Sequence, residues 1–388
     1  MDVRYNTDMD HFITYYGIEC PPGAESAVLE DSIMQKGRPV TAGSKILENF
    51  ISPLDATVVT RLEASGIKIL GKTKMDEFGA AGLFAEAKEE SSGAVSAVAD
   101  GDATFALCND YSGTVRRQAA ARGVCYIHPT YGTVSRYGLI PAAPSMDHIG
   151  VVCKTPADGF RVLSIIAGYD PKDGAMLPAG QGLGLEGLGF RGQGLGDEGD
   201  EGREGVRIGV PVNVLGQIPD TTAVEEFAKG FETVDFELKY FDVYAQVMQI
   251  LCCAEISSST TRYDGVKFGY RASGFKDLHE LYIKSRTEAF GPEAKFTAIA
   301  GAMLLSQEKY DKHYDKAMRI RRLIKESLEF DKYDAIILPA SGGESGFRLA
   351  LHALPQLCGL PSLTMPFNGS GITLVADAGG EGVLVASG

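Results

Sequence analysis

Three polar residues carry side chains of types that could perform nucleophilic catalysis. Thr114 follows Gly113 in the segment "ALCNDYSGTVRRQAA", Ser91 lies in "EESSGAVSAV", and Glu30 lies in "VLEDSIMQKG". A threonine hydroxyl can act as a nucleophile, and a carboxylate can act as a base. Taken singly, each has a simpler interpretation: Thr114 as a turn residue between a strand and a helix, Ser91 as a helix cap, and Glu30 as a solvated surface carboxylate. The chemistry therefore depends on whether the fold brings the three together.

The composition is typical of a soluble globular protein with a large core. The chain has 388 residues, of which 44% are hydrophobic and 23% charged. It contains no apolar run of about 18 residues, so the sequence predicts no membrane-spanning helix. The net charge of -14 argues against a broad nucleic-acid-binding surface. The polar, acidic N-terminal segment is unlike a signal peptide, and we expect a cytoplasmic protein.

The cysteines give no sign of a metal site. Their number is odd, none forms a CxxC pair, and no histidine lies at metal-ligand spacing from them: Cys20, Cys108, Cys125, Cys153, Cys252, Cys253 and Cys358. Such a scattered set is typical of reduced thiols. The sequence predicts no metal.

Helical and strand patterns follow one another closely, which favours an α/β fold. Asp55 is expected to cap a helix that ends at Gly66, and "IKIL" after it is expected to form a buried strand. Helices are also expected at 156–167, 222–233, 278–290 and 310–330. In the last of these, the residues expected to face inward are Met318, Ile320, Leu323 and Ile324. The final segment, "GGEGVLVASG", has the pattern of a strand with no closing helix.

Residues 179–205 differ in composition from the rest of the chain, with eleven glycines in 27 positions. Ordering so many glycines costs much backbone entropy and buries little surface, so we expect a flexible insertion. A GxGxxG nucleotide loop is a weak alternative, because these glycines follow no strand and open no amphipathic helix. We expect the rest of residues 1–388 to form a single domain.

Several long segments resemble the amidase-signature family, and within it the glutamine-hydrolysing A subunits of tRNA-dependent amidotransferases. The resemblance rests on "IHPTYGTVSRYGLIPAAPSMDHIGV" at 127–151, "SKILENF" at 44–50, "GKTKMDEF" at 71–78 and "TRYDGVKFGYRA" at 261–272. These matches are long, occur in the family's order, and lie within roughly residues 27 to 366.

The resemblance implies an α/β/α sandwich in which a mixed central sheet is flanked by helices. It also implies a serine, cis-serine and lysine triad at one edge of the sheet, with no cofactor. In such A subunits, ammonia released from glutamine passes to a B subunit, which acts on the tRNA-borne glutamate. The expected partners are therefore B and C subunits of an amidotransferase complex, with tRNA contacted only through a partner and no membrane.

Carried over by alignment, the triad positions fall on Glu30, Ser91 and Thr114. The lysine position of the family's "KDNI" stretch is occupied by Glu30, and the nucleophilic serine of "GSDTGGSIR" by Thr114. The bridging serine of "GGSSGGSAAA" is best matched by Ser91.

The loop that holds the substrate oxyanion corresponds to Asp110, Tyr111, Ser112 and Gly113. Tyr111 and Ser112 stand where the family has a small residue and a glycine, so side chains are expected where slim backbone amides are needed. Where the A subunit has an Arg pair for the glutamine carboxylate, this chain has Phe296 and Thr297.

Two of the three triad positions thus carry a residue of different chemistry. The effects on rate of substitutions within such a catalytic unit are not additive. The favoured interpretation is a catalytically impaired relative that acts in binding or as a scaffold. The alternative is an active amidase or glutaminase that uses Thr114 as its nucleophile. A third interpretation is a decayed gene product without a stable role.

Overall fold

A single mixed sheet runs through the part of the chain that the structure describes. The computed structural model describes residues 10–21, 23–84, 92–178, 205–343 and 345–388. Within them, 11 strands pair in the order β1-β3-β2-β4-β6-β5-β10-β11-β9-β7-β8. The strands are β1 (Phe12–Tyr15), β2 (Ser26–Glu30), β3 (Lys68–Thr73), β4 (Phe105–Cys108), β5 (Cys125–His128), β6 (Gly150–Cys153), β7 (Arg207–Pro211), β8 (Glu232–Phe236), β9 (Ala335–Pro339), β10 (Ser362–Phe367) and β11 (Ser370–Ala376).

Parallel and antiparallel pairs both occur. The strand β2 lies between β3 and β4 and is parallel to both, and β7 lies between β8 and β9 in the same way. The strands from β4 through β6, β5, β10 and β11 to β9 pair antiparallel. The expected mixed sheet is confirmed.

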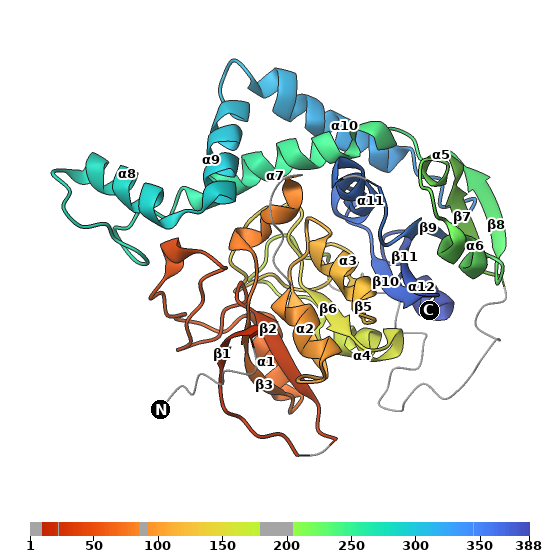
Figure 1. The fold of residues 1–388 in the computed structure, drawn as a ribbon, viewed down its shortest axis with the longest axis horizontal. Helices are drawn as coiled ribbons and strands as arrows, with labels where there is room; N and C mark the ends of the chain where they lie inside the picture. The colour runs from red at the N-terminus through yellow and green to blue at the C-terminus, as the bar shows by residue number, and fades with distance from the viewer. Residues whose placement is uncertain (1–9, 22, 85–91, 179–204, 344) are drawn as a thin grey trace.

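Helices cover both faces of this sheet (Figure 1). They are α1 (Thr57–Ala64), α2 (Gly93–Ala99), α3 (Thr114–Ala121), α4 (Pro156–Ile166), α5 (Val212–Leu215), α6 (Thr222–Ala228), α7 (Tyr244–Thr260), α8 (Leu278–Ala289), α9 (Pro292–Leu304), α10 (Lys316–Glu326), α11 (Ser345–Cys358) and α12 (Glu381–Ser387). Short 3-10 turns include η2 (Glu77–Gly79) and η3 (Ala81–Leu83).

Side chains alternate between the two faces of the sheet along each strand, and this alternation explains why helices pack on both faces. In β9, Ala335 and Ile337 belong to the buried cluster that includes residues of α1, α4, α6 and α12 on one face of the sheet, while Ile336 and Leu338 belong to the cluster that includes residues of α7 and α11 on the other. Because successive side chains of a strand point to opposite faces, a fully buried apolar strand supplies a core to both sides. The same alternation in β4 directs Ala106 and Cys108 towards α2 and α3.

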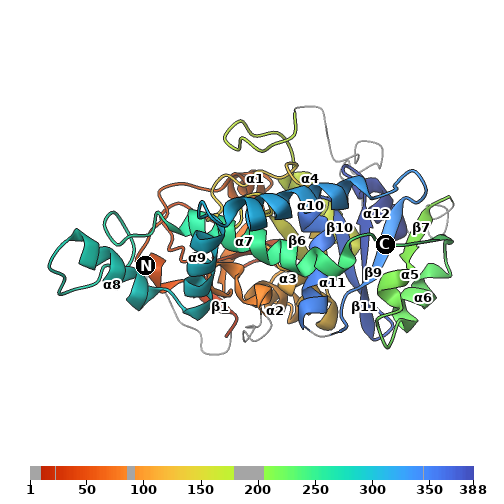
Figure 2. The ribbon, with the colours of Figure 1, turned by 90° about the horizontal axis from the view of Figure 1, so that it is seen from above.

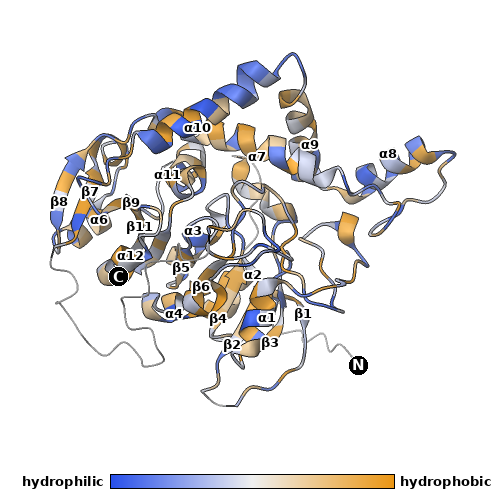
Figure 3. Cartoon of the chain, turned by 180° about the vertical axis from the view of Figure 1, so that it is seen from behind, coloured by the Kyte–Doolittle hydropathy of each residue, from blue (hydrophilic) through white to orange (hydrophobic). Residues whose placement is uncertain are grey.

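A layer of long helices lies across the face that carries α3 and α11. Figure 2 shows α7 and α10 running alongside one another over this face, and Figure 1 shows α8 projecting away from the body of the molecule. Figure 3 shows polar and hydrophobic residues alternating along α10, the pattern of a helix with one buried side.

Some expected elements differ from the structure. The tail, expected as a strand, ends in the helix α12, whose Leu384 is fully buried. The helix expected at 222–233 ends at Ala228, and β8 begins at Glu232. The cap of α1 is Ala56 rather than Asp55, because the Asp55 carboxylate accepts a hydrogen bond from the backbone N–H of Lys36 at 2.7 Å instead.

The helix expected at 310–330 is divided into two parts. A π-helical turn at Tyr310–Asp315 precedes α10. A π turn has a wider repeat than an α turn, so it rotates the following helix relative to a continuous one. Of the four residues expected to face inward, Ile324 is buried as predicted and Ile320 is half-buried, but Met318 and Leu323 are exposed.

Candidate active site

The loop that carries Thr114 connects β4 to α3. Gly113 adopts φ +83° immediately before the helix, and an added Cβ there would lie 2.3 Å from Cβ of His352 on α11. Both the left-handed conformation and the close approach of α11 require glycine at this position. Thr114 is therefore fixed at the first turn of α3, and only 7% of it is exposed.

Asp110 anchors this loop to the helix. Its carboxylate accepts hydrogen bonds from the backbone N–H groups of Val115 and Arg116 at 3.1 and 3.0 Å, and it pairs with Nε of Arg116 at 2.9 Å. Burial alone would raise the pKa of Asp110, but the Arg116 charge and these hydrogen bonds lower it below its usual value. Gln356 donates to the carbonyl oxygen of Asp110 at 2.7 Å. The Asp110 side chain, expected in the oxyanion loop, thus stabilises the start of α3.

The other loop side chains are turned towards neighbours within the protein. The Tyr111 hydroxyl is buried and donates to the carbonyl oxygen of Phe78 at 2.7 Å, and its ring packs against Gly79. The Ser112 hydroxyl donates to Oγ1 of Thr114 at 3.2 Å. Both side chains occupy space close to Thr114.

Glu30, at the end of β2, is buried beside this loop. Its Oε1 accepts hydrogen bonds from Oγ of Ser32 at 2.5 Å and from the backbone N–H of Asn109 at 3.3 Å. Burial raises the pKa of Glu30 to about 8, and the nearby carboxylates of Asp110 and Asp31 add to this rise, against the two hydrogen bonds. At neutral pH the Glu30 carboxyl group is therefore mostly protonated and cannot accept a further proton.

A buried lysine that the sequence reasoning missed lies on the neighbouring strand. Lys72 pairs in register with Leu29 of β2, and its ammonium group donates to the carbonyl oxygen of Ile33. Burial lowers the pKa of Lys72 to about 8, while the charges of Asp31 and Glu30 oppose that shift. A lysine in the run "KILGKT", which reads as a buried strand, was the signal that could have revealed it.

Two small cavities flank Thr114. The first, called here the glutamate cavity, has a volume of about 30 Å³ and is lined by Glu30, Ser92, Tyr111, Ser112 and Thr114, among others. The structure thus places Glu30 and Thr114 against one cavity. Ser91, the expected bridging serine, lies outside the described residues, and its neighbour Ser92 is the serine seen there. Lys72 is not among the lining residues.

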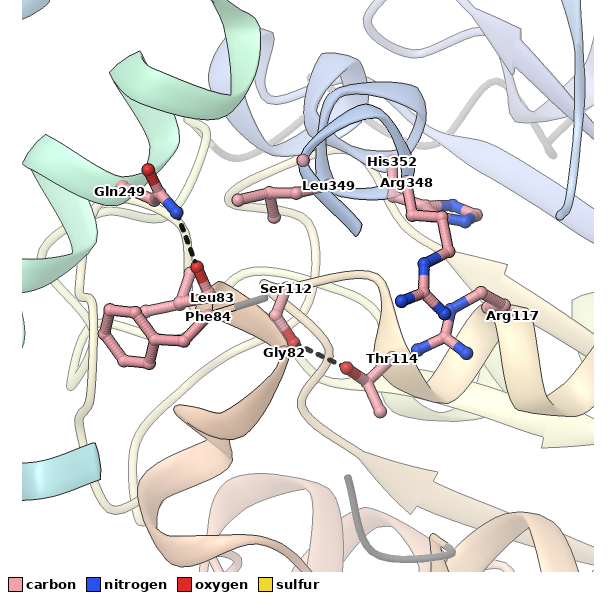
Figure 4. Close-up of a pocket in the computed structure, with 11 residues that line it drawn as sticks. Gly82, Leu83, Phe84, Ser112, Thr114, Arg117, Gln249, Arg348, Leu349 and His352 are labelled. Atoms are coloured by element: carbon pink, nitrogen blue, oxygen red, sulfur yellow. Dashed lines mark hydrogen bonds between the residues drawn. The ribbon is translucent and has the colours of Figure 1, made fainter. Parts of the chain in front are cut away.

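The second cavity, called here the arginine cavity, lies on the side of Thr114 that faces α11. It has a volume of about 40 Å³ and is lined by Gly82, Leu83, Phe84, Ser112, Thr114, Arg117, Gln249, Gly346, Arg348, Leu349 and His352. Figure 4 shows Ser112 and Thr114 on one side of it and the two arginines on another. Each cavity has room for only a few water molecules.

The hydroxyl of Thr114 is covered by the η3 segment. A Cβ added to Gly82 would lie 2.1 Å from Oγ1 of Thr114 and 2.6 Å from Oγ of Ser112. The backbone of Gly82 thus lies against both hydroxyl groups and narrows the space around them.

The positions expected to hold a substrate carboxylate supply no cation. Phe296 is exposed on α9, and its ring lies 4.9 Å from that of Phe84, between centroids. Thr297 is buried and donates to the carbonyl oxygen of Ala294 at 2.9 Å. Among the described residues, no group of three or more His, Cys, Asp and Glu side chains is placed to hold a metal ion, and no helix is long and apolar enough to span a membrane.

The comparison with known proteins agrees with this arrangement of strand, loop and helix. A family model described as Amidase matches residues 27–85 and 90–350. The chain belongs to the amidase family. The match includes Glu30, Thr114 and the whole loop between β4 and α3, so the site lies within the part of the chain that defines the family.

Within the amidase family, the chain is similar to A subunits of glutamyl-tRNA(Gln) amidotransferases. That of Lachnoclostridium phytofermentans is 35% identical over 386 residues, which cover 90% of this chain and 76% of the relative. That of Agathobacter rectalis is 38% identical over 338 residues, covering 81% of this chain and 65% of the relative. The solved structure of the Thermotoga maritima A subunit matches with a TM-score of 0.72 and 25% identity, over 98% of this chain and 86% of that one. The expected family and its α/β/α fold are confirmed.

Proposed function

We propose that this chain is a catalytically impaired member of the amidase family that uses its site for binding rather than for hydrolysis. The observation that carries the proposal is the burial of Glu30 against the cavity that Thr114 lines. A protonated carboxyl group with a pKa of about 8 lies against the cavity that Thr114 lines, where a triad of the expected kind has a lysine. A nucleophilic hydroxyl must lose its proton to a base, and at neutral pH this base is already occupied.

Charge and access also oppose catalysis. If Glu30 does ionise, its negative charge stands near the oxyanion that develops in the transition state, which it destabilises. The backbone of Gly82 lies against the Thr114 hydroxyl, which narrows the space in which a substrate carbonyl could approach it. Members of a catalytic unit act together, and loss of one costs on the order of 10³-fold or more in rate.

One observation favours the alternative of an active amidase with Thr114 as nucleophile. Glu30 and Thr114 line the same cavity, and a carboxylate formed above pH 8 could accept the threonine proton. Such an enzyme would be nearly inactive at pH 6 and would gain activity as the pH rises through 8. This pH profile distinguishes it from an impaired protein, which shows no activity at either pH.

The similarity to A subunits also supports a proposal about partners and location. We propose that the chain can associate with subunits of the B and C type of an amidotransferase complex in the cytoplasm, with tRNA contacted only through those partners. Co-purification of the tagged chain with such subunits from cells that express all three is the direct measurement. Recovery of the chain alone, under conditions in which an active A subunit assembles, contradicts this.

The deciding experiment measures ammonia. The purified chain is incubated with glutamine, and separately with simple aliphatic and aromatic amides, at pH 6, 7 and 9. We expect no release above the level of the Thr114→Ala variant at any pH. Ammonia release from any amide that is abolished by Thr114→Ala overturns the impaired interpretation and establishes threonine as the nucleophile.

A further inference from the structure

The arginine cavity brings together groups that are unlike those needed for amide hydrolysis. Arg117 comes from α3 and Arg348 from α11, and both line the cavity that reaches Thr114 (Figure 4). Both guanidinium groups are positively charged at neutral pH. An anion in the cavity is attracted to them, and the planar guanidinium fork fits carboxylate and phosphate oxygens well.

Arg348 is available for such a ligand. Within the part of the chain that the structure describes, its guanidinium group forms no hydrogen bond, ion pair or ring contact. By comparison, the nearby Arg116 is fully buried and satisfied by Asp110 and Gln356. A half-buried arginine that faces a cavity without a partner has donors to offer to a molecule that enters it.

His352 gives an independent indication of a ligand. It lines the same cavity and is only 3% exposed, and neither ring nitrogen forms a hydrogen bond of good geometry among the described residues, although the backbone of Ala340 lies near the ring. Burial, with the charge of Arg116 next in size, lowers the pKa of His352 to about 3, so the ring is neutral and carries one N–H donor. Buried polar groups are nearly always hydrogen-bonded in folded proteins, and an unpartnered one calls for a missing partner.

The hydroxyl of Thr114 completes the set of donors. Its oxygen accepts the hydrogen bond from Ser112, which leaves its own proton to be donated elsewhere. A carboxylate or phosphate group in the cavity would accept it. The volume of about 40 Å³ corresponds to a few water molecules, which is the size of one such group.

We propose that the arginine cavity binds the oxyanion group of a small molecule, a carboxylate or a phosphate, with Arg117 and Arg348 as the charged partners and with Thr114 and His352 as hydrogen-bond donors. This inference deepens the proposed function and rests on it in one respect: Thr114 serves as a binding hydroxyl rather than as a nucleophile. The ligand enters with its anionic group foremost, and the remainder of the molecule stays outside the enclosed space.

The test uses the full chain and two probes, sodium phosphate and sodium acetate, at pH 7, with sodium chloride at equal ionic strength as the reference. Isothermal titration and thermal unfolding are measured for the unmodified protein and for Arg348→Gln. We expect at least one probe to bind and to raise the melting temperature, and Arg348→Gln to weaken that binding at least tenfold. Arg319→Gln on α10, whose side chain is 78% exposed, is the matched control and should leave binding unchanged.

The two probes separate the sources of the anion. Binding of phosphate alone assigns a phosphate-bearing ligand, and binding of acetate alone assigns a carboxylate-bearing one. The NMR signals of the His352 ring give a second readout and should shift on addition of the bound probe, even if Arg348→Gln is poorly folded. The inference is wrong if neither probe binds, or if binding leaves the His352 signals unmoved and is equal in Arg348→Gln.

The outcome is independent of the ammonia assay. Failure of both probes leaves a catalytically impaired protein without this ligand class. Ammonia release that depends on Thr114 removes the binding role of the threonine, while the arginine contacts are still judged by the titration.

Discussion

Glu30 and Thr114 border one cavity, yet their functional groups are poorly matched for proton transfer at neutral pH. The carboxyl group keeps its own proton because burial outweighs the two hydrogen bonds that favour its ionised form. Lys72 is nearby in the sheet, but its ammonium group is directed to the carbonyl oxygen of Ile33 and not to the cavity. The proposed impairment therefore predicts that hydrolysis requires changes at more than one residue.

We expect Thr114→Ser alone to release no ammonia, because it supplies a less hindered hydroxyl without a base to receive the proton. Adding Glu30→Lys provides nucleophile and base together. A simple amide should then be hydrolysed at a rate above the single variants, whereas glutamine should not, since Phe296 and Thr297 offer no cation for its carboxylate. Hydrolysis of glutamine by the Thr114→Ser variant alone would contradict this account.

The protonated state of Glu30 has a consequence for stability. The unfolded chain loses the Glu30 proton near pH 4.5, while the folded protein holds it to about pH 8, so this residue reduces stability as the pH rises between these values. Glu30→Gln should remove that loss, with a gain over the unmodified protein of about 1.4 kcal/mol per pH unit in this window. Chemical denaturation at pH 5.5 and 7.5 measures it. Glu63→Gln, at an exposed position on α1, should show no such change, and equal slopes for all three proteins would refute the assignment.

At the scale of elements, α3 is positioned by a buried ion pair rather than by its own propensity. We expect Asp110→Asn to destabilise the protein by about 3–5 kcal/mol, because Arg116 is then a buried charge without its counter-ion. Asp100→Asn breaks the exposed pair with Arg122 and should cost no more than about 1 kcal/mol. Urea denaturation of both variants gives the comparison, and similar costs would show that the burial of the first pair has no energetic role.

The elements that could be predicted from the sequence are those whose pattern is local. The helix α4 begins at Pro156 and ends at Ile166, close to the expected 156–167, because Thr155 caps it and one apolar stripe faces the core. The tail could not be predicted in this way. Its alternating "GVLVAS" fits a strand, but the helix α12 is held by a distant contact, the hydrogen bond from the backbone N–H of Thr130 to the carboxylate of Glu381.

The candidate site could likewise be predicted only where its residues lie in one continuous segment. The loop around Thr114 could be located because its residues form one continuous segment of the sequence. The structure places Glu30 beside this loop. The pair Arg117 and Arg348 could not be found, because the two residues are brought together only when α3 and α11 pack on the same face of the sheet. Tertiary proximity of this kind leaves no periodic signal in the chain.

At the scale of the whole molecule, the shared sheet supports the proposal that residues 1–388 form one domain with an insertion at 179–205. We expect a single cooperative thermal transition with equal calorimetric and van't Hoff enthalpies. Such a transition also excludes a decayed gene product. Two separate transitions would show that the two sides of the insertion unfold independently.

We expect the buried imidazole groups to contribute to the response of this transition to acid. The pKa of His148 is lowered by burial to about 3, so the folded protein stays neutral there while the unfolded chain takes up a proton below about pH 6.5. The unfolded state then binds more protons, and stability falls as the pH drops from 6.5 towards 3. His148→Gln should flatten this decline by up to about 1.4 kcal/mol per pH unit, whereas His279→Gln, at an exposed position on α8, should not. An unchanged decline in His148→Gln would exclude this residue as a cause.

The pairing of β5 with β10 constrains when the protein can fold during synthesis. In the described sheet, the strands β1 to β6 and the strands β7 to β11 meet only through this ladder, in which Ile127 lies opposite Leu363. A nascent chain that has left the ribosome as far as residue 128 must therefore keep one edge of β5 open until residues 362–364 emerge. An unpaired apolar edge invites association with other chains. The β5 edge must be kept from pairing with other chains for more than half of translation, and a chaperone that binds the nascent chain could do this.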